Sequence, residues 1–134
     1  LVGSARRLRV FSALTPKPST YEHLVRRGAD GKETEVVFPR AAIEDMLRVV
    51  PAETARVAVE DGQFTLLEGT SFPMDAGLTL SDDRLGLWGR DEEGISRAGI
   101  DTDAPEAVAW GESLYEEVRA NARPVDLLEM MEGA

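Results

Sequence analysis

Few side chains in this 134-residue chain are suited to catalysis, and none is spaced for a catalytic or metal site. His23 is the only histidine, and there is no cysteine. A two-histidine metal site, a cysteine-based zinc site and a thiolate nucleophile are therefore excluded. The acidic pairs and triplets, such as Asp82-Asp83, lie at expected turns and helix ends, where carboxylates accept hydrogen bonds from the backbone. The sequence predicts no catalytic residue, no metal and no cofactor, and therefore a chain that is not an enzyme.

Noncovalent binding of a small molecule has better candidates. In α/β domains ligands tend to bind at the carboxyl ends of the strands, where loops and helix N-termini meet. Arg40 follows one such strand end and would hold an acid group, while Trp88 would cover an apolar face. The expected ligand is a small anionic or polyhydroxylated metabolite. The candidate ligand-binding residues are Ser12, Thr15, Tyr21, His23, Phe38, Arg40 and Trp88.

Each of these residues also has a purely structural interpretation. Arg40 could pair with Glu44, four positions along the same expected helix. His23 could be solvated on a surface helix, and Trp88 could be a core or covering residue. Both interpretations stay open at the level of sequence.

The composition describes one globular, acidic domain. Hydrophobic residues make up 43% of the chain and charged residues 30%, and the net charge is −10. Such a charge repels phosphate backbones, so this segment is not expected to bind nucleic acid by itself. All but two of the 15 basic residues are arginines, the exceptions being Lys17 and Lys32. An acidic surface with few lysines suits concentrated salt and favours a haloarchaeal source over an ordinary acidic bacterial one.

Hydrophobic periodicity predicts a single α/β domain over residues 1–134, with a mixed sheet of about six strands, a C-terminal antiparallel meander and flanking helices. Strands are expected at 34–38, 64–67, 78–80, 84–89 and 95–100. Residues 8–14 form a strand or a single helical turn. Helices are expected at 19–27 with a stop at Gly28, at 39–50, at 52–61 and at 103–122. The tail 125–131 either packs back on the domain or reaches a partner.

The helix after the meander has the clearest pattern. Its apolar residues Ala107, Trp110, Leu114 and Val118 recur in steps of three and four, which places them on one predicted core face. Asp103 and Glu106, with Pro105 between them, have the spacing of a capping box.

The segment Ile100-Asp101-Thr102-Asp103-Ala104-Pro105 and its continuation to Trp110 resembles a family motif. With the preceding turn at Asp82-Asp83 and the stretch 85–94, it is similar to the C-terminal regulatory domain of archaeal winged-helix transcription regulators, the methanogenesis-regulator-like and TrmB-like group. The resemblance implies a core related to phospholipase D that has lost the catalytic His-x-Lys. His23 is indeed followed two positions later by Val25.

The resemblance also implies a function. It indicates a cytoplasmic, non-catalytic, ligand-sensing domain of a transcription regulator that forms a homodimer and responds to a small-molecule effector. Residues 4–14 could be read as the first helix of a winged helix, but no Arg- or Lys-rich recognition helix follows. The DNA-binding winged helix is therefore expected before residue 1. A dimerisation or interaction module without a small ligand is the alternative.

Overall fold

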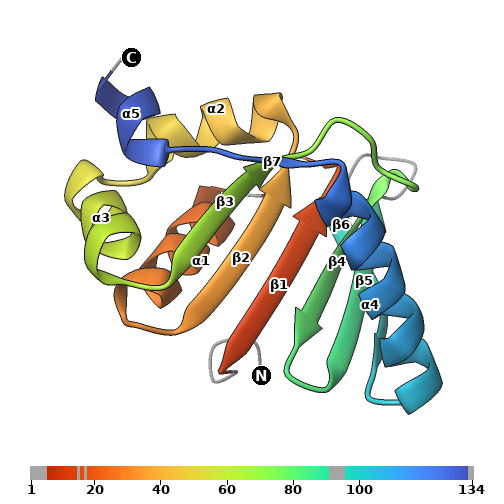
Figure 1. Ribbon diagram of the computed structural model, residues 1–134. Helices are drawn as coiled ribbons and strands as arrows, with labels where there is room; N and C mark the ends of the chain where they lie inside the picture. The colour runs from red at the N-terminus through yellow and green to blue at the C-terminus, as the bar shows by residue number, and fades with distance from the viewer. Residues whose placement is uncertain (1–5, 15, 17, 91–95, 133–134) are drawn as a thin grey trace.

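The computed structural model describes residues 6–14, 16, 18–90 and 96–132. In this part of the chain seven strands form one mixed sheet in the order β6-β5-β4-β1-β2-β3-β7 (Figure 1). β1 pairs in parallel with β2, β2 pairs in parallel with β3, and the pairs from β1 through β4 and β5 to β6 are antiparallel. The predicted mixed sheet with an antiparallel meander is confirmed. The strands are β1 Arg7–Ser12, β2 Glu33–Phe38, β3 Phe64–Glu68, β4 Ala76–Ser81, β5 Arg84–Arg90, β6 Ser96–Thr102 and β7 Arg123–Pro124.

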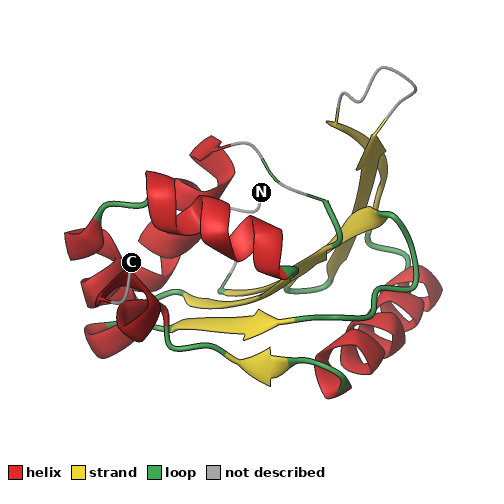
Figure 2. Cartoon of the chain, turned by 90° about the horizontal axis from the view of Figure 1, so that it is seen from above, coloured by secondary structure: helices red, strands yellow, loops and turns green. Residues whose placement is uncertain are grey.

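Helices cover both faces of the sheet. Figure 2 shows α4 on one side and the other helices on the opposite side. None of the helices in the described ranges is long and apolar enough to cross a membrane. The helices are α1 Pro18–Ala29, α2 Arg40–Val49, α3 Ala52–Arg56 with its π-helical continuation η2 Val57–Asp61, α4 Pro105–Ala120 and α5 Leu127–Glu132.

The segment 8–14, which sequence left open between strand and helical turn, contains the strand β1 near the middle of the sheet. Leu8 and Val10 point into the core under α1 and α2, whereas Phe11 points into the core under α4. The segment is too short for periodicity to separate a strand from a helical turn, and burial on both faces removes the simple alternation of a half-exposed strand.

The predicted core face of α4 is confirmed at Val118 and wrong at Trp110, while Ala107 and Leu114 are partly buried against the core. Trp110 is 47% exposed, and the buried stripe is Val108, Gly111, Tyr115 and Val118. Gly111 lets the helix approach the sheet closely, because a Cβ there would lie 2.7 Å from Leu85 Cδ1. The sheet surface beneath α4 also offers a carboxylate to the hydroxyl of Tyr115, a contact that hydrophobic spacing does not reveal.

Two further local predictions need correction. The capping box at Asp103 and Glu106 does not form: the N-cap is Ala104, whose backbone N–H donates to Thr102 Oγ1 at 3.1 Å. Gly28 does not stop its helix either. It lies inside α1, against Phe64, where a Cβ would lie 2.5 Å from the Phe64 Cβ.

The tail packs back on the domain. Arg123–Pro124 forms the short edge strand β7 beside β3, where a proline is tolerated because its missing N–H faces outward. α5 then inserts Leu127, which is 1% exposed, into the core that contains α2 and α3. The C-terminal segment thus connects the α4 side of the sheet to the opposite helical layer.

The phase of α4 predicts unequal effects of two aromatic substitutions on one helix. Tyr115→Ala should lower the free energy of unfolding by about 3–5 kcal/mol, as expected for truncating a buried aromatic side chain. Trp110→Ala should lower it by less than about 1 kcal/mol, because half of that side chain is already in water. Urea denaturation of both variants measures the difference. A larger loss from Trp110→Ala would contradict this phase.

Candidate ligand-binding site

A small apolar cavity lies between α1 and the meander. We call it the Trp88 pocket, and its volume is ≈ 100 Å³. Strands β1, β2, β4 and β5 and helix α1 all contribute to it. Its lining consists of Leu8, Val10, Pro16, Thr20, His23, Leu24, Phe38, Thr79 and Trp88.

The pocket exists because helical cover ends at β1. The core formed by α1, α2, α3 and α5 lies over β1, β2 and β3. On the same side of the sheet, β4 and β5 present Gly77, Thr79, Gly86 and Trp88. Figure 2 shows that β5 and β6 rise toward the side that carries α1. The space between α1 and the meander is closed by Trp88 instead of by a helix.

The position of Trp88 depends on Gly77. The two residues are directly paired across β4 and β5. A Cβ on Gly77 would lie 2.1 Å from Cζ2 of the indole, so the ring can lie against the strand only because Gly77 has no side chain. Trp88 is thereby held as a flat wall, partly buried against the main core.

Phe38 forms the wall on the side of β2, and Tyr21 fixes it from behind. The two rings meet edge to face, with centroids 5.8 Å apart. Tyr21 is 1% exposed, and its hydroxyl has no hydrogen-bond partner within the described ranges. Burial, with a smaller contribution from the negative charge of Asp45, raises the pKa of Tyr21 to about 12. Tyr21 therefore stays neutral and serves as packing behind the pocket.

Three of the candidate residues predicted from sequence meet in this pocket, namely His23, Phe38 and Trp88. Ser12 is buried and bonded locally: its hydroxyl donates to the Leu14 carbonyl at 2.9 Å and accepts from the Leu14 N–H at 3.1 Å. Arg40 lies elsewhere and pairs with Glu68 at 3.2 Å, not with Glu44. Thr15 lies outside the described residues.

Sequence reasoning missed most of the aliphatic and hydroxyl lining. One signal was available on α1, since Thr20, His23 and Leu24 have the i, i+3, i+4 spacing of one helical face. Another was Thr79, which alternates with the buried Leu78 and Leu80 and must point to the opposite side of β4.

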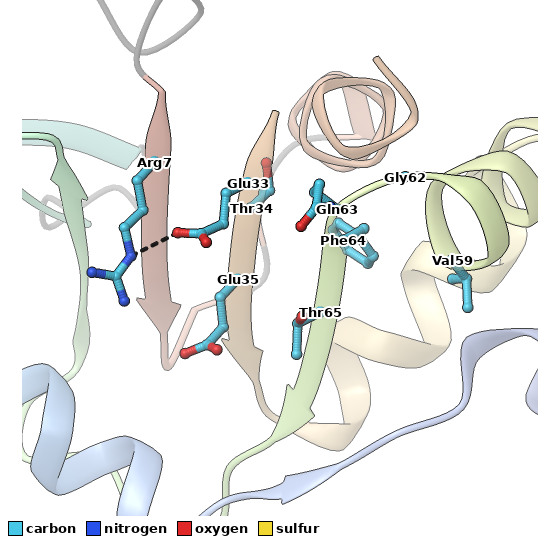
Figure 3. A pocket seen from close by; sticks show the side chains of 9 residues that line it. All are labelled: Arg7, Glu33, Thr34, Glu35, Val59, Gly62, Gln63, Phe64 and Thr65. Atoms are coloured by element: carbon cyan, nitrogen blue, oxygen red, sulfur yellow. Dashed lines mark ion pairs between the residues drawn. The ribbon is translucent and has the colours of Figure 1, made fainter. Parts of the chain in front are cut away.

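A second, polar hollow of ≈ 350 Å³ lies at the amino ends of the parallel strands (Figure 3). Its charged groups are largely paired with neighbours: Arg7 Nε lies 2.8 Å from Glu33 Oε2, and Glu35 is held by α4. A ligand there would compete with these pairs. It is lined by Arg7, Glu33, Thr34, Glu35, Val59, Gly62, Gln63, Phe64 and Thr65.

The contact between Glu35 and α4 is the main polar link between that helix and the sheet. The hydroxyl of Tyr115 donates to Glu35 Oε1 at 2.6 Å, and Arg119 Nε donates to the same atom at 2.9 Å. Burial, followed by the hydrogen bond to Glu35, raises the pKa of Tyr115 far above its ordinary value. The guanidinium of Arg9 lies 5.8 Å from the centroid of the Tyr115 ring. This arrangement fixes α4 to the sheet.

Metal binding has no support in the part of the chain that the structure describes. No group of three or more His, Cys, Asp or Glu side chains there could hold an ion.

Comparison with known families decides the relationship. Residues 1–121 match the model of the family described as methanogenesis regulatory protein FilR1, middle domain. The chain belongs to this family. The family is one of transcription regulators, and its match covers every element up to the end of α4, whereas β7 and α5 lie beyond it. No curated protein sequence matches the chain.

Solved structures share the fold of this domain at low sequence identity. TrmBL2, an archaeal chromatin protein, superimposes with a TM-score of 0.67 and 11% identity over 92% of this chain. The chain spans about half, 47%, of TrmBL2. Nuc from Salmonella typhimurium, a phospholipase D family member, gives a TM-score of 0.66 at 13% identity, with 92% of this chain and 85% of Nuc covered. NucT from Helicobacter pylori gives 0.64 at 10%, with 92% and 86% covered. The fold is thus phospholipase-D-like, as predicted.

Gly77 provides a direct test of how the pocket is built. Gly77→Ala should destabilise the domain by about 1–3 kcal/mol, because the new methyl group overlaps the indole of Trp88. Gly86→Ala is the matched control: its Cβ would lie 3.8 Å from the nearest atom, an ordinary contact, and the cost should stay within about 0.5 kcal/mol.

Both substitutions should be made in a Trp110→Phe background, so that Trp88 is the sole tryptophan. Gly77→Ala should then also change the emission of Trp88. Equal stability and emission in the two glycine variants would show that the indole does not lie against Gly77.

Proposed function

We propose that this FilR1-family domain is the non-catalytic, ligand-sensing part of a DNA-binding transcription regulator and that its effector binds in the Trp88 pocket. The observation that carries the proposal is the pocket itself. Four strands and a helix line it, and its lining includes two aromatic walls and one imidazole. Its lining, mostly apolar with a few polar groups, is like that of small-molecule sites, but its volume of ≈ 100 Å³ is below the roughly 300–1,000 Å³ usual for them.

The non-catalytic assignment is supported by the sequence. An activity like that of the phospholipase-D-like enzymes of this fold is not expected here, because the single histidine is not followed by the lysine of a His-x-Lys pair. His23 is exposed at the mouth of an apolar pocket, and the described lining residues include no acid or second base to assist it. Binding, without chemistry, is what these groups can do.

Regulation would operate through a population shift. An effector that fits one arrangement of α1 relative to the meander better than another would stabilise that arrangement by its difference in affinity. The proposal includes a homodimer in the cytoplasm, with DNA contacted by a winged-helix domain preceding residue 1. A haloarchaeal source is also proposed, on the basis of the net charge of −10.

A dimerisation module without a ligand is the second candidate. The observation in its favour is a pair of exposed apolar side chains, Ile100 at 50% and Trp110 at 47%. Nine residues, about two and a half helical turns, separate Trp110 from Arg119, so the two side chains lie on opposite flanks of α4. Trp110 is therefore on the flank opposite the contact between Arg119 and Glu35. Within the described ranges β6, which carries Ile100, pairs on one side only, with β5.

A metabolite screen on the domain tests the ligand-sensing proposal. A compound that binds the folded state should raise the melting temperature and change the emission of Trp88 in the Trp110→Phe background. Thr20→Leu should abolish both responses, because the larger side chain fills the pocket. Ser19→Leu adds the same apolar group at an exposed neighbouring position on α1 and should leave both responses intact.

The ligand-free module gives a different outcome. No compound would then act through Trp88, and any stabilising compound would affect Thr20→Leu and wild type equally. That result would reject the Trp88 pocket as the effector site.

A further inference from the structure

The walls of the Trp88 pocket are matched to a planar group. The indole of Trp88 lies flat against Gly77. Phe38 is held in place by its edge-to-face contact with Tyr21 of α1. Leu8, Val10 and Leu24 complete an aliphatic floor. Aromatic side chains bind other rings in stacked or edge-to-face arrangements that no open-chain polar molecule can use.

The size of the pocket limits what can enter. Its volume is ≈ 100 Å³. An apolar cavity of roughly 150 Å³ is enough to bind benzene, whereas one water molecule occupies roughly 30 Å³ in the liquid. A single small ring therefore fits when it is partly seated, with its substituents at the open mouth.

The charge of the lining further limits the kind of ligand that can bind. Among the described residues the lining contains no carboxylate, ammonium or guanidinium group. A charged ligand group would lose its hydration there without gaining a partner of opposite charge from these described residues. The polar atoms on offer are the hydroxyls of Thr20 and Thr79 and the imidazole of His23, which is exposed at the mouth.

We infer that the Trp88 pocket binds the neutral ring of an aromatic ligand, of the phenol class, whose polar substituent hydrogen-bonds at the mouth to His23. This inference rests on the proposed function and narrows its ligand. It departs from the anionic metabolite expected from sequence, because Arg40, the cation on which that expectation depended, pairs with Glu68 outside the pocket.

Three small probes distinguish the ligand classes. Phenol supplies a neutral ring with a hydroxyl, benzoate supplies the same ring with a charge at neutral pH, and glycerol supplies hydroxyls without a ring. The readout is the indole N–H resonance of Trp88, which is unique in the Trp110→Phe chain. Phenol should shift this resonance saturably, in the millimolar range expected for so small a ligand, and bind at least about tenfold more tightly than benzoate or glycerol.

Variants locate the binding. Thr20→Leu should lower the affinity for phenol by about tenfold or more, and Ser19→Leu should bind phenol as tightly as the parent does. His23→Leu should lower the affinity for phenol and leave the affinity for toluene unchanged, since toluene has no hydroxyl to form a hydrogen bond with His23. Circular dichroism shows that each variant is folded before it is titrated.

Two failures are distinguishable. Tighter binding of benzoate or glycerol at Trp88, or no binding of phenol while a screened metabolite still binds there, would overturn the aromatic class and leave the effector site in place. Failure of phenol and of every screened metabolite to act through Trp88 would overturn the proposed function together with this inference.

Discussion

The arrangement of the parallel strands determines where this domain can hold a ligand. Parallel neighbours need a crossover, and two crossovers of the same hand that progress in one direction place their helices on the same face of the sheet. β1, β2 and β3 follow this rule, so α1, α2 and α3 cover those three strands and no more. The chain then returns to the other side of β1 and extends the sheet antiparallel through β4 to β6. That half of the sheet receives no crossover helix on the α1 side, and Trp88 closes the gap.

The other face of the sheet, under α4, is covered by a single helix that is held by polar contacts. Beneath α4 the strands carry Arg9 and Glu35, which an aliphatic helix face would leave unpaired at a cost in free energy. Tyr115 and Arg119 satisfy Glu35, since the Tyr115 hydroxyl and Arg119 Nε both donate to it, whereas Nε of Arg9 is buried with no hydrogen-bond partner among the described residues. The two faces therefore differ in character: α4 is fixed by a charged network, and the face around Trp88 stays apolar and partly open.

Sequence predicted the elements and their order because most of them have strong periodicity or strong terminators. Several of its failures share a cause, namely that partners distant in the chain override local pattern. Trp110 ranks as a core residue by spacing, yet Tyr115 takes that role through Glu35, 80 positions away. Arg40 had a plausible partner one turn along its helix, but Glu68 on β3 holds it. The pocket was predicted in part, since the reasoning about strand ends included His23, Phe38 and Trp88, whereas the dependence of Trp88 on Gly77 required the register of β4 against β5.

The central claim is that occupancy of the Trp88 pocket controls the regulator. The most direct measurement is the affinity of the full-length protein for its DNA site, at fixed salt, with and without a compound that binds at Trp88. Salt must be fixed because phosphate contacts make such affinities strongly salt-dependent. Wild type and Ser19→Leu should show the same change in affinity on adding the compound, and Thr20→Leu should show no change on adding it. An unchanged affinity in wild type with the pocket saturated, or an equal response in Thr20→Leu, would contradict the claim.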